Sequence, residues 1–197
     1  MGKQLELLLF LLFLVGGCAQ SRLLLDRNLL IPFEEFAEKS KFKPGSQAVS
    51  LAVIDERDRD RKELLGMAKT GARYKDTPLI VPGGVKQFVK DYYLKEMSER
   101  GFVFSDQSST LIELVVKNLW VDELQEKFKG ERAKCHVEIE LYAKKGPTSF
   151  KARYWAKITS AGNLGDGTDH IAPTLASCLN LSIEKMAKDN KFTDFLN

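Results

Sequence analysis

The sequence predicts an α+β domain of two layers, in which two helices pack on one face of a mainly antiparallel sheet of about four to five strands. Several segments alternate apolar and polar residues, as strands do, and two others carry apolar residues at helical spacing. Helices gathered on one face of a sheet bury both kinds of apolar surface economically. We expect this single domain to span residues 48–197.

The first 17 residues have the three parts of a secretory signal. Lys3 supplies a positive charge, residues 7–15 are only Leu, Phe and Val, and Gly16 and Gly17 form a small-residue exit. This apolar run is much shorter than the roughly 20 residues that a membrane-spanning helix needs. Residues 1–17 are therefore expected to be a signal peptide.

Val15-Gly16-Gly17-Cys18 resembles the lipobox of bacterial lipoproteins. In that family the cysteine thiol receives a diacylglyceryl group, and a peptidase cuts before the cysteine. The resemblance implies lipidation at Cys18 and anchorage to a membrane. A single acyl chain binds membranes only marginally, so two or three chains make the attachment durable. The alternative is an ordinary signal peptide that happens to precede a cysteine.

Residues 18–47 are expected to be a lipidated N-terminus and tether. Leucines are frequent between Arg22 and Pro32, more than a bare spacer needs. We expect them to pack on the domain; contact with a partner or with the lipid surface is the alternative. The sequence Lys43-Pro44-Gly45 predicts a turn.

The first half of the domain is expected to contain a strand, a long connection and a helix. Ala48–Asp55 has apolar residues on both faces, which predicts an interior strand. The charge run over residues 56–63 predicts a solvated loop, and the glycines and prolines of residues 66–84 predict an irregular connection. Val85–Arg100 carries one apolar stripe and is followed by Gly101, as expected of a helix.

The second half is expected to contain most of the sheet. After a short strand at residues 102–104, the alternation predicts strands over Thr110–Val121, Ala133–Ala143 and Ser149–Thr159. A turn at residues 145–147 makes the last two strands a hairpin. Its outer face sets Glu138 and Glu140 against Lys151 and Arg153, so we expect this face to be solvated.

The chain is expected to end in a helix over Ala172–Lys188. Thr168 or Asp169 is the expected N-cap, and Pro173 suits a first turn. The glycine-rich segment before it lacks the endings of phosphate-binding and calcium-binding loops, and so predicts a turn that leads into the helix.

Charge and cysteine content limit the classes of function. The net charge of +3 is far from the dense basic surface of a nucleic-acid-binding protein, so no nucleic acid is expected. Cys135 and Cys178 fall on a strand and a helix in facing layers. Such layers lie about 10 Å apart, whereas bridged Cα atoms lie within about 7 Å. This favours two buried free thiols over a disulfide.

We find no pattern for catalysis or for a cofactor. His136 and His170 have no second ligand at metal spacing, and no Gly-x-Ser-x-Gly motif occurs. His136 is expected on the solvated face. Trp155 falls on that face between Arg153 and Lys157, where an exposed aromatic side chain suits contact with a glycan, a lipid headgroup or a protein. We expect no catalytic residue, no cofactor and no metal.

A series of short motifs runs along nearly the whole chain: the lipobox at Cys18, Asp55 with Arg57, Leu65-Gly66, Gly71, Ile80, Gly101-Phe102, residues 111–119, residues 189–192 and Leu196. Together these motifs resemble the YajG family of uncharacterised bacterial lipoproteins. The resemblance implies an envelope lipoprotein without an established biochemical activity. In enterobacterial lipoproteins an Asp directly after the lipidated cysteine marks retention in the inner membrane; Ala19 here implies the outer membrane.

These observations leave three hypotheses. The first is a non-enzymatic interaction or auxiliary module, anchored through Cys18 at the periplasmic face of the outer membrane, that contacts envelope proteins or a cell-wall polymer through Trp155, Arg153 and Lys157. The second is an envelope hydrolase with an unrecognised site. The third is a purely structural lipoprotein. In outline the layout also resembles auxiliary lipoproteins of envelope transport, but a shared fold does not fix a function.

Overall fold

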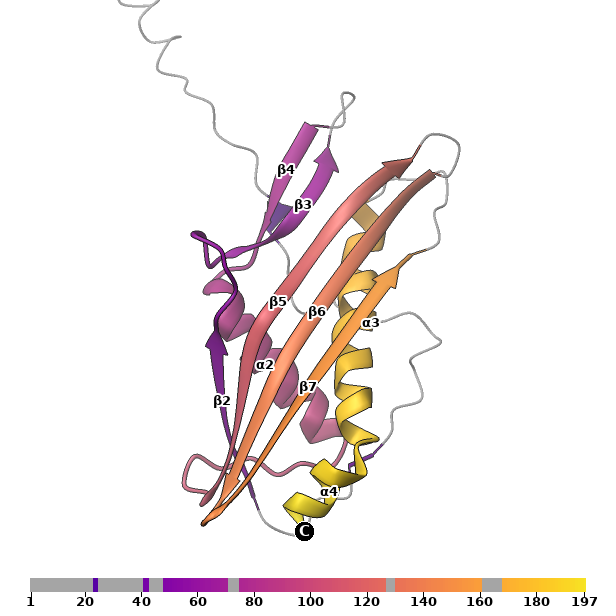
Figure 1. The fold of residues 1–197 in the computed structure, drawn as a ribbon. Helices are drawn as coiled ribbons and strands as arrows, with labels where there is room; N and C mark the ends of the chain where they lie inside the picture. The colour runs from indigo at the N-terminus through magenta and orange to yellow at the C-terminus, as the bar shows by residue number, and fades with distance from the viewer. Residues whose placement is uncertain (1–22, 25–40, 43–47, 71–74, 127–129, 161–167) are drawn as a thin grey trace, which may run out of the picture.

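The computed structural model describes residues 23–24, 41–42, 48–70, 75–126, 130–160 and 168–197. Its strands and helices follow one another along the chain in the order shown in Figure 1. They are β1 (Leu23–Leu24), β2 (Ser50–Asp55), β3 (Leu64–Thr70), β4 (Lys75–Ile80), α2 (Gly84–Glu99), β5 (Thr110–Glu126), β6 (Gly130–Lys145), β7 (Thr148–Thr159), α3 (Thr168–Ala187) and α4 (Asn190–Leu196).

The predicted fold class is confirmed. The strands form one sheet in the order β1-β4-β3-β5-β6-β7, with β2 paired to β5, and the helices lie on one face (Figure 1). The long pairings β5–β6 and β6–β7 are antiparallel, whereas β2 and β3 pair with β5 in parallel. The sheet has seven strands, more than the expected four to five, because β1 and the β3–β4 hairpin extend it.

The region of residues 64–80, expected to be irregular, is a hairpin, so this prediction was wrong. Gly66 lies inside β3 at a register shift, where a Cβ atom would come within 1.7 Å of the Val121 carbonyl oxygen. The glycine therefore permits a close approach of two strands instead of ending one. Pro78 lies within β4. Leu79 and Ile80, which follow it, are the residues that pair with β1, so the missing N–H of Pro78 removes no hydrogen bond of that pairing.

The prediction of an interior position for the strand of residues 48–55 was also wrong. β2 pairs with β5 on one side only, apart from an isolated bridge between Val49 and Phe104 at its start. Leu51 and Val53 are buried as expected, but Ile54 on the other face is 38% exposed. The expected short strand at residues 102–104 is reduced to that bridge.

Both predicted helices are present with altered ends. α2 ends before Gly101, whose φ of 106° is in the left-handed region. α3 begins at Thr168, so Pro173 lies inside the helix and not in its first turn as predicted. The side chains of the predicted caps Thr168 and Asp169 lie outside the described part of the chain. A separate helix α4 follows, capped by the Asp189 side chain.

The core lies between the sheet and the helices, and it includes residues from the expected tether. Phe42 is buried, with its ring 4.5 Å from that of Phe102, and β1 pairs with the end of β4. Residues 18–22, 25–40 and 43–47 of the expected tether, which include the predicted turn at residues 43–45, lie outside the described residues. Cys135 and Cys178 are buried and free, as predicted. Within the described residues, no helix is long and apolar enough to cross a membrane.

The seam between α2 and α3 is polar. The Tyr93 hydroxyl lies 2.6 Å from the Ser182 hydroxyl, and the Arg100 guanidinium donates to Glu184 over 2.5 Å. Asn180 donates to the Tyr92 hydroxyl over 3.1 Å. Burial is the main reason why the pKa values of both tyrosines are raised, so these hydroxyls stay protonated and serve as hydrogen-bonding groups.

One edge of β5 is shared by two strands. Residues 50–55 of β2 pair with residues 111–116, and Gly66 and Met67 of β3 pair with Val121 and Asp122. β2 and β3 therefore run in the same direction along one edge, and the charge run of residues 56–63 lies between them. A register shift between Val116 and Asn118 of β5 lies opposite this interruption.

Arg57 fills the interruption. The charge run was expected to be solvated, and most of it is, but Arg57 is only 4% exposed. Its guanidinium pairs with the Asp55 carboxylate over 2.9 and 3.0 Å. It also donates to the carbonyl oxygens of Leu64, over 2.8 Å, and Leu119, over 3.3 Å. One side chain thus connects the end of β2, the start of β3 and the middle of β5.

The Arg57→Ala substitution should strongly destabilise the fold, because it leaves the Asp55 carboxylate, 6% exposed, without its counter-charge. Removing one partner of a buried ion pair typically costs about 3–5 kcal/mol. Urea denaturation of the full chain measures this loss. The matched control is Arg61→Ala in the same loop, whose pair with Glu63 is about 40% exposed on both sides; it should cost at most about 1 kcal/mol. Equal losses in the two variants would contradict the assigned role.

The pH dependence of stability should report the same pair. Burial opposes ionisation of Asp55 and is the largest single influence, but the hydrogen bonds and charge of Arg57 outweigh it, so the Asp55 pKa lies below its ordinary 3.8. Stabilisation from a carboxyl group with a lowered pKa is present above 3.8 and is lost as the pH falls through the folded-state pKa. The free energy of unfolding should therefore fall more steeply below pH 4 in the wild type than in Asp55→Asn. Parallel pH profiles would argue against this coupling.

Candidate interaction surface

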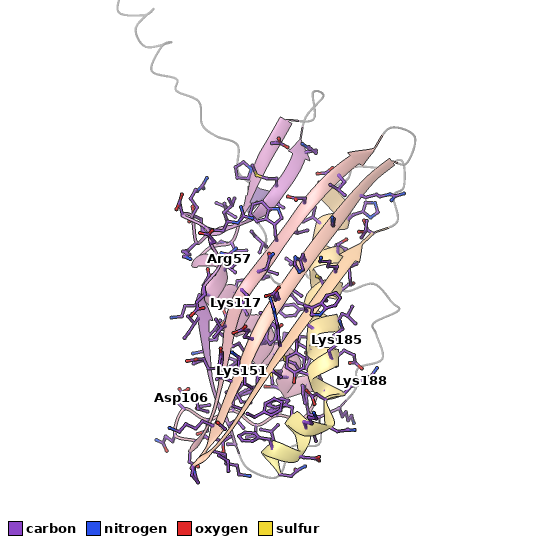
Figure 2. The ribbon with its side chains drawn as sticks, in the orientation of Figure 1. Arg57, Asp106, Lys117, Lys151, Lys185 and Lys188 are labelled. Carbon is purple, nitrogen blue, oxygen red and sulfur yellow. The ribbon has the colours of Figure 1, made fainter. Side chains whose placement is uncertain are left out.

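The face of the sheet opposite the helices is the solvated face predicted from the hairpin. Alternate residues of β6 are fully buried, among them Val137, Ile139 and Leu141. The residues between them, His136, Glu138, Glu140 and Tyr142, are only partly buried and point to the open side. Figure 2 shows Lys117 and Lys151 among the side chains of these strands. We call this surface, formed by β5, β6 and β7, the open face.

Ion pairs neutralise the part of the open face near the β6–β7 turn. Arg153 pairs with Glu138, and Lys151 lies 3.6 Å from Glu140, as the cross-strand pattern predicted. Lys117 pairs with Glu56 over 2.6 Å. A hydrogen bond from the Tyr142 hydroxyl is the main reason why the pKa of Glu140 is lowered. Cations and carboxylates therefore balance each other in this part.

Trp155 is half exposed on the open face, as predicted, with 51% of its surface accessible. The sequence placed it between Arg153 and Lys157 but did not indicate a third cation. The Lys185 ammonium of α3 lies 4.3 Å from the centre of the Trp155 ring and donates to the Trp155 carbonyl oxygen over 2.6 Å. This contact braces the indole, because it fixes both the ring and its backbone.

Lys157 lies beside His136 in the cross-strand register, and His136 in turn lies beside Trp120. Asn118 Nδ2 is 3.1 Å from His136 Nδ1. Partial burial, and then the charge of Lys157, lower the pKa of His136. His136 is therefore on the expected face but is less solvated than predicted. The sequence could have indicated that Lys157 lies beside it, because the turn between β6 and β7 sets the register of the hairpin.

The structure brings the three predicted contact residues onto one face but in different settings. Arg153 is neutralised by Glu138, Trp155 is held by Lys185, and Lys157 has no acidic partner among the described residues. Cys18 lies outside the described residues, so its lipidation stays a prediction. Among the described residues, no group of three or more His, Cys, Asp or Glu is arranged to hold a metal ion.

These features define an α+β domain with helices on one side of the sheet and a charged open face on the other. A family model described as an uncharacterized lipoprotein matches residues 38–197. Because this match covers most of the chain, the chain belongs to that family of lipoproteins.

Comparison with solved structures identifies a bacterial protein with a similar fold. A protein from Xanthomonas campestris of the DUF330 family superposes with a TM-score of 0.57 at 9% identity, over 80% of this chain and 93% of that chain. A minor lipoprotein from Acinetobacter baumannii gives a TM-score of 0.42 at 8% identity, over 75% of this chain and 95% of that chain. No curated protein sequence matches the chain. At 9% identity the similarity to the Xanthomonas campestris protein extends to the fold alone.

Proposed function

We propose that the protein is a lipid-anchored envelope lipoprotein that acts as a non-enzymatic interaction or auxiliary module facing the periplasm. Membership of a lipoprotein family and the lipobox ending at Cys18 support the anchor. The YajG-like motifs favour the cell envelope, and Ala19 favours its outer membrane. The anchored domain then presents its open face to envelope proteins or to a cell-wall polymer.

The observation that carries this proposal is the exposed but braced indole of Trp155. Large aromatic side chains with one fixed orientation lose little entropy on binding and are frequent among the residues that dominate interfaces. Lys185 restrains this ring, while Arg153 and Lys157 flank it on the same strand face. The combination suits a partner with an apolar group next to negative charge.

The Cys18→Ala substitution should release the protein from the membrane, because the thiol to which the lipid is attached is removed. We expect radiolabelled palmitate in the wild-type protein and none in the variant, and detergent should be needed to extract only the wild type. Mass spectrometry of the mature N-terminus provides an independent measurement. An unlabelled wild-type protein that washes from broken cells without detergent would overturn the anchor.

The triple substitution of Trp155, Arg153 and Lys157 by alanine should remove binding to the partner. Crosslinking in cells and mild solubilisation should recover specific envelope proteins or cell-wall material with the wild type, and at least about tenfold less with the variant, which corresponds to about 1.4 kcal/mol. The matched control replaces Lys86, Lys95 and the exposed Val103 by alanine, at positions outside the open face. Equal recovery with both triple variants would exclude this contact surface.

A further inference from the structure

The open face contains a pocket of about 230 Å³ at the end far from the β6–β7 turn. It is smaller than the roughly 300–1,000 Å³ of pockets for drug-sized ligands, so it suits a single small group. Its lining includes a tryptophan, a histidine and three cations from separate segments. These residues are Trp120 of β5, His136 and Lys134 of β6, Lys157 of β7, and Arg59 of the loop between β2 and β3.

The register of the sheet brings the pocket residues together. Trp120, His136 and Lys157 are direct cross-strand neighbours, and Lys134 lies opposite Asp122 in the next row. Side chains at such positions on one face are about 4.5–5.5 Å apart at their Cβ atoms. The Arg59 guanidinium lies over the Trp120 ring, 4.2 Å from its centre. The indole N–H donates to Asp122 over 2.6 Å, which fixes the ring.

The cations of this pocket differ from three other cations of the open face. Lys117, Lys151 and Arg153 each have a carboxylate partner. Lys134, Lys157 and Arg59 form no ion pair with any residue in the part of the chain that the structure describes. Among the described residues that line the pocket, Asp122 is the one carboxylate. Three cations beside one carboxylate leave an excess of positive charge in a concave site.

His136 adds a directed donor. The Asn118 amide N–H₂ faces His136 Nδ1 at 3.1 Å, so a neutral ring accepts at Nδ1 and carries its proton on Nε2. The charged groups around the ring are Lys157, Lys134, Glu138, Asp122 and Arg59. A bound anion would offset the lysine charges that help to lower the pKa of His136. The pKa of His136 would therefore rise on binding and can be used to measure it.

We propose that this pocket binds a phosphate group, either as free phosphate or as the phosphate ester of a lipid headgroup. Lysine ammonium groups and arginine guanidinium groups are common phosphate ligands. Their number here suits a group with more than one charged oxygen. Trp120 supplies an apolar wall for the organic part of an ester.

The position of the pocket relative to the N-terminus favours contact with headgroups. Leu23 pairs with Leu79, Leu79 with Gly66, and Gly66 with Val121. Val121 lies between the pocket residues Trp120 and Asp122, so β1 lies at the same height along the strands as the pocket. Cys18 precedes Leu23 by five residues, a length that spans at most about 18 Å. This step rests on the proposed lipid anchor; binding of free phosphate does not.

The two histidines make the test specific. The full-length lipidated protein, labelled with ¹³C and ¹⁵N in histidine side chains and held in dodecyl maltoside micelles, is titrated with sodium phosphate against sodium chloride of equal ionic strength. We expect a saturable rise of the His136 pKa by about 0.5 or more, with His170 unchanged as internal reference. Lys134→Gln/Lys157→Gln should weaken binding at least tenfold. Lys144→Gln, on the same strand and face, should bind like the wild type.

A second series of micelles distinguishes the sources of phosphate. They contain phosphatidylglycerol or, at equal charge, oleate. A response to phosphatidylglycerol and not to oleate supports a headgroup ligand, and a response to inorganic phosphate alone supports free phosphate. No saturable response of His136 to either phosphate source, an equal response to oleate, or an unchanged response in the double variant overturns the proposal. The phosphate titration is also repeated with Cys18→Ala. Because binding of free phosphate needs no lipid on Cys18, this experiment tests the pocket independently of the proposed anchor.

Discussion

Two strands follow each other along one edge of β5, and the chain leaves the sheet between them. Such an interruption exposes backbone carbonyl groups that the sheet would otherwise satisfy, and their burial without donors is costly. The Arg57 guanidinium supplies the donors, and Asp55 supplies the charge that makes burial of the guanidinium tolerable. Within the loop of residues 58–63, Lys62 contributes to this arrangement, because its carbonyl oxygen accepts from Arg57 and its ammonium donates to the Arg57 carbonyl oxygen. Most of the other charged side chains of the loop are exposed to solvent.

Local patterns predicted most of the fold, and long-range contacts account for what they missed. The alternation along β6 and β7 and the turn between them set the register, so the ion pairs of the open face were foreseeable. The β3–β4 hairpin was missed because Gly66 and Pro78 normally interrupt strands, and only the proximity of Val121 explains the glycine. Arg57 could not be distinguished within a charge run, since its partner Leu119 is 62 residues away. Arg59 and Trp120 were missed as pocket residues for the same reason.

The open face divides into two parts with different electrostatics. Near the β6–β7 turn Lys151 and Arg153 pair with carboxylates of the neighbouring strand, and charge there contributes mainly to solubility and correct register. At the other end the cations line a hollow without equivalent carboxylates. The braced Trp155 lies between these parts, opposite Glu138 in the register. A partner that covers Trp155 could therefore extend either toward the ion pairs or toward the cations of the pocket. Salt would weaken binding more in the second case, because the pocket cations are not neutralised by neighbouring carboxylates.

The polar seam between α2 and α3 has a consequence for how the helices are held. Apolar side chains tolerate a shift of one helix along another, because one methyl group substitutes for the next. The contacts of Tyr93 with Ser182, Arg100 with Glu184 and Asn180 with Tyr92 fit at one alignment only. A slide by one turn would break all of them at once and leave buried polar groups unsatisfied. The layer above the sheet is thus fixed in its lengthwise position, as a buried asparagine fixes the alignment of a coiled coil.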